Sequence, residues 1–145
     1  MPWFASRVRH PFYPGFAAAR AAAAIGRHTA LAGTVEELRR AAVRGARARK
    51  AIFILNHNGE LWPGREARDE LWRLFEVPSY VIRLDAEGRQ LGWECEAQEG
   101  LHAAGRQRGC PPGFRLETET CACGRPGARL IRACAEEMAP AAPRD

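Results

Sequence analysis

Several features that would identify common classes of protein are missing from this 145-residue chain. No apolar run approaches the roughly 20 residues that a membrane-spanning helix needs, and the longest candidate, residues 15–26, is interrupted by Arg20. The chain has only two serines, Ser6 and Ser79, and it contains no G-x-S-x-G, P-loop or H-E-x-x-H motif. We therefore expect a protein without a membrane span and without catalytic activity.

Acidic residues are absent from the first 35 positions, although the chain as a whole carries 22 Lys and Arg against 17 Asp and Glu. The basic excess is concentrated in the N-terminal third, a pattern compatible with contact to nucleic acid or another anion. The candidate contact residues are Arg39, Arg40, Arg44, Arg47 and Lys50. The alternative is that this basic stretch complements the acidic middle of the chain within one fold.

Residues 1–33 form a first segment, for which we expect a basic tail followed by an Ala-rich helix. Its spaced arginines also fit an organellar targeting segment, which stays an alternative. Its aromatic residues suggest a contact surface for a protein partner or a second copy of the chain, and these are Trp3, Phe4, Phe12 and Tyr13. Because the cysteine count is odd and no secretion signal is present, we expect a reducing, cytoplasmic location.

Residues 34–100 are expected to form an α+β core built from β-hairpins with flanking helices. Thr34 and Glu37 make a capping-box pattern that predicts a helix over 35–49. The apolar run 51–55 predicts a buried strand, and Asn58-Gly59 predicts a hairpin to a second strand that ends at Pro63-Gly64.

A further helix is predicted over 65–77, with a core stripe of Ala67, Leu71, Leu74 and Phe75, followed by a second hairpin over 79–97. In that hairpin the alternation places Leu91, Trp93, Cys95 and Ala97 inward and Glu94 and Glu96 outward. The resulting element order predicts a small antiparallel sheet with flanking helices. The order is similar to that of profilin-like and roadblock-type interaction domains, a fold-level analogy that implies no function.

Residues 101–145 are rich in Cys, Gly and Pro, and we expect them to pack on the core as a third segment. The pattern predicts a strand over 114–121 and a closing helix over 128–138. Four of the five cysteines lie within 25 residues here. Thiolates grouped in this way are typical ligands of structural zinc.

The predicted zinc ligands are Cys110, Cys121, Cys123 and Cys134. Cys95 and His102 are alternatives for the fourth position, because Cys134 falls on an apolar stripe. The segment "CACGRPGARL" resembles the Cys-x-Cys-Gly-Arg loop of phenylacetate–CoA-ligase-like adenylate-forming enzymes, which implies a cysteine knuckle. The phosphate-binding and adenylate motifs of that family are absent, so the resemblance implies no catalytic residue.

Three functional hypotheses follow. The first is a non-catalytic binding or adaptor domain with a structural zinc knuckle and a protein partner. The second is nucleic-acid binding through the basic N-terminal third. The third is an enzyme, either a thiol redox protein that uses Cys121 and Cys123 or one centred on His57 with Glu94 or Glu96.

Overall fold

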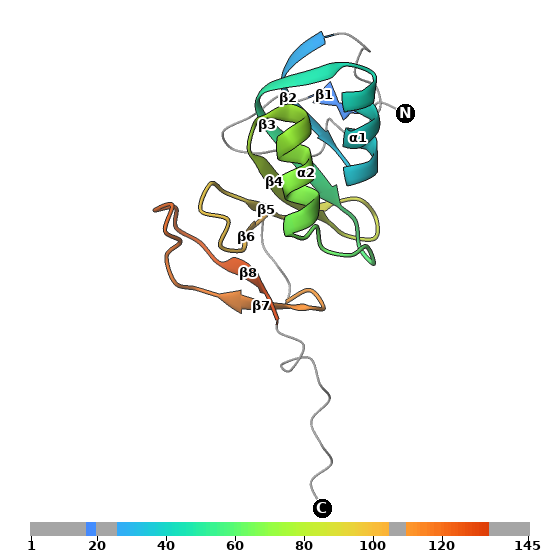
Figure 1. Ribbon diagram of the computed structural model, residues 1–145. Coiled ribbons are helices and arrows are strands. Elements are labelled where there is room, and N and C mark those ends of the chain that lie inside the picture. The colour runs from blue at the N-terminus through green and yellow to red at the C-terminus, as the bar shows by residue number, and fades with distance from the viewer. Residues whose placement is uncertain (1–16, 20–25, 105–109, 134–145) are drawn as a thin grey trace, which may run out of the picture.

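The computed structural model describes residues 17–19, 26–104 and 110–133. These residues form an α+β fold in which two helices lie on the same face of one mixed sheet (Figure 1). The helices are α1 (Val35–Val43) and α2 (Arg65–Phe75). The strands are β1 (Ala17–Ala18), β2 (Gly26–Gly33), β3 (Ala46–Asn56), β4 (Ser79–Leu84), β5 (Gln90–Glu94), β6 (Leu101–Ala103), β7 (Phe114–Glu117) and β8 (Arg129–Arg132).

The sheet has the strand order β1-β2-β3-β4-β5-β6-β8-β7. Strands β1 to β4 pair in parallel, and strands β5 to β8 add to β4 in antiparallel fashion. The sheet is therefore mixed rather than the small antiparallel hairpin sheet that we expected. The cause is the strand–helix–strand–helix–strand order of β2, α1, β3, α2 and β4, since a helix between two strands returns the chain in the same direction.

Helix α1 begins as predicted, with both hydrogen bonds of the capping box between Thr34 and Glu37. It ends at Val43 rather than at residue 49, because Gly45 adopts a φ of 91° that no helix can continue. Strand β3 then starts at Ala46. The last four residues of the predicted helix, 46–49, are thus the first four of the longest strand.

The Asn58-Gly59 turn is present, and Gly59 has the positive φ of 83° that such a turn requires. No strand lies between this turn and α2, because the chain continues through Pro63 directly to the helix. The predicted first hairpin is therefore wrong, although its turn is correct. The partner of the 51–55 run is instead β4, which pairs with it in parallel.

Helix α2 and the second hairpin are present as predicted, but the alternation predicted for the second strand is wrong, because Gly92 is buried and Leu91 and Trp93 are only partly buried. Leu71 and Phe75 are buried, and α2 ends at Phe75 with Glu76 in the left-handed conformation. Strands β4 and β5 pair as a hairpin, with Gly88 at a φ of 76° in the loop. Glu94 was expected to point outward, but it is only 3% exposed.

Two other expectations are corrected at the ends of the chain. Residues 129–132 are strand β8, not the first part of a helix, and the rest of the predicted helix lies outside the described residues. Residues 17–18 and 26–33 are strands, so they do not belong to the expected Ala-rich helix. Residues 20–25 and the aromatic side chains of residues 3–13 lie outside the described residues.

The main apolar core lies between the sheet and the two helices. Its largest fully buried members include Leu31, Leu38, Ile52, Ile54 and Leu71. The other face of the sheet buries a second cluster around Phe53, Ile82 and Leu84. A strand buried on both faces reads as a continuous apolar run, which explains why 51–55 was recognised so easily. In the part of the chain that the structure describes, no helix has the length and apolarity to cross a membrane.

Candidate metal centre

Four side chains with metal-ligating atoms meet where the antiparallel strands join. Cys95 directly follows β5, His102 lies in β6, and Cys121 and Cys123 lie between β7 and β8. One ligand atom from each lies within 4.8 Å of the others. Cys95, His102 and Cys121 are buried and Cys123 is partly exposed, so the group is closed on most sides.

Two turns of the same form present the three sulfurs. In one, the N–H of Gln98 donates to the carbonyl of Cys95 at 3.0 Å, and in the other the N–H of Gly124 donates to the carbonyl of Cys121 at 2.8 Å. Gln98 and Gly124 both have positive φ, 53° and 83° respectively. Each stretch is thus a tight four-residue turn that begins at a cysteine.

Backbone N–H groups point at two of the sulfurs from these turns. The N–H of Ala97 hydrogen-bonds to the Cys95 sulfur, and the N–H of Arg125 hydrogen-bonds to the Cys123 sulfur. In both cases the donor is two residues after the cysteine. Such donors stabilise thiolate charge and hold the sulfur in place around a metal.

The distances within the group fit one tetrahedral ion. The sulfurs of Cys95 and Cys121 are 3.7 Å apart, and the Cys123 sulfur is 3.4 Å from His102 Nε2. With Zn–S bonds of about 2.3 Å and Zn–N bonds of about 2.0 Å, tetrahedral angles place two sulfurs about 3.8 Å apart and a sulfur and a nitrogen about 3.5 Å apart. These two distances are close to those of a zinc site, and all four ligand atoms lie within 4.8 Å of one another, so the group could hold a metal ion.

The electrostatics of the group differ from one ligand to the next. Burial raises the pKa of the Cys95 thiol to about 11, so this thiol ionises at neutral pH only with a compensating cation. Burial also opposes ionisation of Cys123, but the Arg125 N–H and the neighbouring thiols outweigh it and lower the pKa of that thiol. Burial, followed by the charges of Arg125 and Arg129, lowers the pKa of His102 and keeps its ring neutral, the form that binds metals.

Aromatic and charged side chains fix the orientation of His102. Its ring stacks on Trp93 with the ring centroids 4.5 Å apart and the planes inclined by 21°. On Trp93 lies the guanidinium of Arg125, 5.7 Å from the ring centroid, and Arg125 also forms an ion pair with Glu96 at 3.3 Å. These contacts hold the imidazole in place independently of a metal.

The sequence prediction overlaps with this group in part. Cys121 and Cys123 are in it, and the two alternatives for the fourth ligand, Cys95 and His102, are both in it. Cys110 is exposed and outside the group, and its sulfur lies 2.9 Å from the carbonyl oxygen of Phe114. Cys134 lies outside the described residues.

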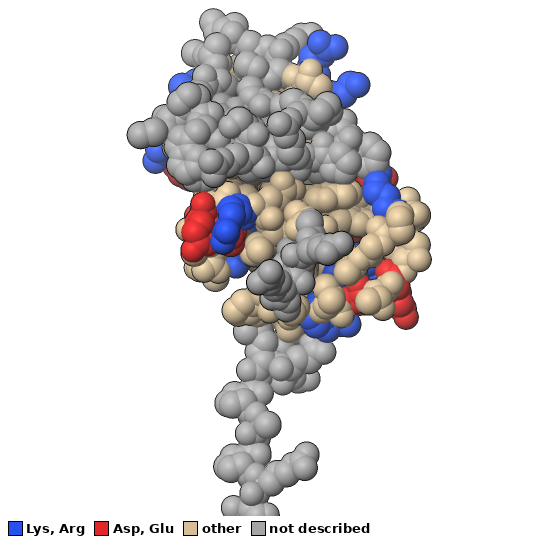
Figure 2. All heavy atoms as spheres, turned by 180° about the vertical axis from the view of Figure 1, so that it is seen from behind, with Lys and Arg blue, Asp and Glu red and all other residues tan. Residues whose placement is uncertain are grey.

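The five basic residues proposed for anion contact lie on two elements. Arg39 and Arg40 are on α1, where Arg39 forms a pair of hydrogen bonds with Glu70 and Arg40 lies 3.2 Å from Glu36. Arg44 directly follows α1, and its guanidinium donates a hydrogen bond to the carbonyl of Ala19. Arg47 and Lys50 are exposed on β3. From behind, basic side chains also lie beside acidic ones (Figure 2). Nucleic-acid binding stays a prediction.

In the described residues, the two glutamates of the His57-centred enzyme hypothesis have other partners. Glu94 is buried and paired with Arg68, whereas Glu96 is exposed and paired with Arg125. The cavity that Glu94 lines does not include His57. The sulfurs of Cys121 and Cys123, the pair of the redox hypothesis, lie within 4.8 Å of each other, and the Cys95 sulfur lies 3.7 Å from that of Cys121. The redox hypothesis stays a prediction.

Comparison with known proteins adds no family to these observations. No protein-family model matches the chain, and no curated protein matches it. Function is therefore argued from the site alone.

Proposed function

We propose that this protein is a non-catalytic binding module whose antiparallel strands are organised by one structural zinc ion. The ligands are Cys95, His102, Cys121 and Cys123. The observation that supports this most directly is the mutual approach of four ligand atoms within 4.8 Å in a buried site. Three thiolates and one imidazole are a usual donor set for structural zinc.

The ion would join two segments that are separated in the sequence. Cys95 and His102 border the loop between β5 and β6, and Cys121 and Cys123 border the loop that leads to β8. All four positions of a tetrahedral ion are filled by protein ligands, which leaves none for a substrate. A closed site of this kind stabilises a fold and does not activate water.

The test is the metal content of protein purified without chelator and without affinity nickel. We expect one zinc per chain by elemental mass spectrometry and the release of three further reactive thiols when the metal is chelated. Cobalt in place of zinc should give a thiolate-to-cobalt charge-transfer band, because three ligands are sulfurs.

Two variants distinguish this ligand set from the set that the sequence predicted. Cys121→Ser removes a buried ligand, so it should lower zinc content well below one per chain. Cys110→Ser removes an exposed thiol outside the group and should leave zinc content unchanged. Protein that carries no zinc, or an equal loss in both variants, would contradict the proposed site.

A further inference from the structure

A groove lies beside the metal centre and opens to solvent between α2 and the strands β7 and β8. It consists of two cavities of about 440 and 610 Å³ that share the side chains of Trp62, Arg68, Gln98 and Arg132. The two cavities are adjacent, because these four residues line both of them, and we call the two together the tryptophan groove.

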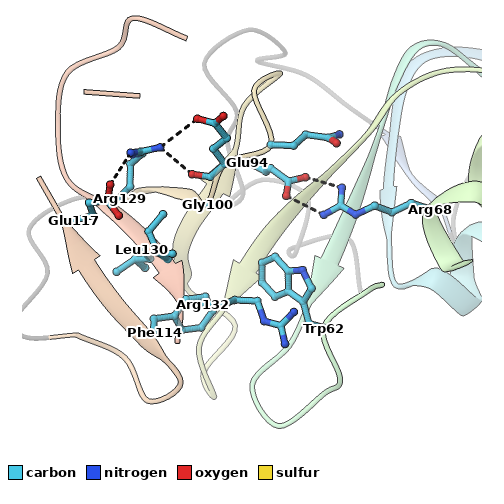
Figure 3. Close-up of a pocket in the computed structure, with 12 residues that line it drawn as sticks. Trp62, Arg68, Glu94, Gly100, Phe114, Glu117, Arg129, Leu130 and Arg132 are labelled. Carbon is cyan, nitrogen blue, oxygen red and sulfur yellow. Dashed lines mark hydrogen bonds and ion pairs between the residues drawn. The ribbon is translucent and has the colours of Figure 1, made fainter. Parts of the chain in front are cut away.

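Aromatic side chains line the groove along its length. Trp62 stands at its centre, with the Phe114 ring against its edge at a centroid distance of 6.0 Å and an angle of 68° (Figure 3). Trp72, farther along on α2, is 55% exposed, which is unusual for so large an apolar side chain. Tryptophan is the residue type that most often anchors a bound partner, and grooves lined by aromatic rings accept extended apolar or proline-rich peptides.

The charges inside the groove are paired, with one exception. Arg68 holds Glu94 in a two-fold hydrogen bond, and Arg129 holds Glu117 at 3.1 Å; Figure 3 shows these pairs on opposite sides of the cavity. Arg132 lines both cavities, and its guanidinium lies 5.3 Å from the centre of the Trp62 ring. Within the described residues it forms no ion pair, so a carboxylate from a ligand complements it.

The groove and the metal centre use the same segments of chain. Gln98, Glu99 and Gly100 line the groove and lie between the ligands Cys95 and His102. The strand that supplies Arg129 to Arg132 begins six residues after the ligand Cys123. A metal ion that fixes both loops therefore also fixes the distance between the walls of the groove.

We propose that the tryptophan groove binds an extended segment of a partner protein, with apolar or proline side chains on Trp62 and Trp72 and a carboxylate at Arg132. This inference rests on the proposed function and names the partner of the binding module. Binding should depend on zinc, because loss of the ion releases the loop that carries Gln98 to Gly100.

The experiment screens a degenerate library of capped octapeptides against the full-length, zinc-loaded protein and, in parallel, against Trp72→Ala. Peptides enriched on the wild type should share an acidic residue next to proline or an apolar residue. In ¹H–¹⁵N spectra they should shift the indole N–H signals of Trp62 and Trp72. Trp72→Ala and Arg132→Gln should each weaken binding at least tenfold.

Leu61→Ala is the matched control, because Leu61 is 94% exposed and lines neither cavity of the groove. It should leave peptide affinity unchanged. No enrichment over Trp72→Ala, in protein with one measured zinc per chain, would overturn the groove proposal and leave the metal centre intact. Enrichment in protein without zinc would overturn the metal dependence instead. Equal shifts with benzoate alone would replace the peptide with a small aromatic carboxylate.

Discussion

The sheet has two halves that are held together in different ways. The parallel half, β2 to β4 with α1 and α2, surrounds a core of large aliphatic side chains such as Leu31, Ile52 and Leu71. The antiparallel half, β5 to β8, has far fewer, and Leu101 and Leu130 are its fully buried large apolar residues in the described chain. Its other buried side chains are Glu94, Cys95, His102, Cys121 and Arg129, all of which are polar or metal-ligating.

This difference indicates where each half obtains its stability. Apolar burial contributes about 25 cal/mol for each Å² removed from water, and the parallel half has the area for it. A small region without a sufficient core of its own needs a metal, a disulfide or another cross-link. In the antiparallel half the proposed zinc site would fill this role, supported by the ion pairs Arg68–Glu94 and Arg129–Glu117.

Loss of zinc should have the largest effect, and the effect should be confined to one half. Structural zinc contributes about 10 kcal/mol or more to the folding of small zinc domains, which exceeds the contribution of any single side chain. We expect Cys121→Ser to abolish amide hydrogen-exchange protection in β5, β6 and β8 while β2, β3 and β4 keep most of theirs. Exchange mass spectrometry with peptide resolution measures both halves in one experiment.

Cys110→Ser is the control for this measurement, since it removes a thiol from the same half without touching the group. It should leave exchange in both halves unchanged. If Cys121→Ser instead exposes β2 to β4 to the same extent, the two halves form one cooperative unit and the distinction between them is wrong.

The ion pair between Arg68 and Glu94 should rank second, because it joins the two halves. Arg68 is on α2, and Glu94 on β5 also accepts the N–H of Val81 at 3.2 Å. Glu94→Gln leaves the guanidinium in a mostly buried position without its counter-charge, which typically costs about 3 kcal/mol. Urea denaturation should show this loss in the free energy of unfolding.

Glu96→Gln provides the comparison, because Glu96 lies two residues away and pairs with Arg125 at an exposed position. An exposed pair contributes less than about 1 kcal/mol, so this variant should be close to the wild type. Equal losses in the two variants would mean that the burial of Glu94 has no energetic consequence.

Three elements of the parallel half could be predicted from the sequence, but β2, the start of β3 and the parallel pairing could not. Helices α1 and α2 and the run 51–55 were recognised because periodicity and capping are local signals. The parallel pairing was missed because Asn58-Gly59 was interpreted as a hairpin, which concealed the crossover from β3 to β4. The burial of Glu94 was missed because its partner, Arg68, lies 26 residues away.

For the metal group, the residue types could be predicted from the sequence, but the full set of four could not. The residue types were identified from their chemistry, and Cys121 and Cys123 from their spacing. Cys95 and His102 were considered only as alternatives to Cys134 for the fourth position. Their joint presence depends on the pairing of β6 with β5 and β8, which brings residues 95 and 102 to the knuckle at 121–123. No spacing rule for a single segment contains that information.

The smallest predicted effect belongs to the surface of the parallel half. Hydrogen bonds from Arg39 lower the pKa of Glu70 below its usual range. The folded protein therefore binds this proton less readily than the unfolded chain, so the pair stabilises the fold above the usual glutamate pKa and is lost as pH falls through the lowered value. At neutral pH we expect Glu70→Gln to cost less than about 1 kcal/mol, because both side chains are substantially exposed. The difference in unfolding free energy between this variant and the wild type should then shrink toward zero as the solution is acidified.

Glu66→Gln, which removes a charge from an exposed position on the same helix, should show no comparable trend. Because all three proteins share the metal group, acid release of zinc cancels in these differences. A constant difference at every pH would mean that the charge of Glu70 is not what stabilises the pair.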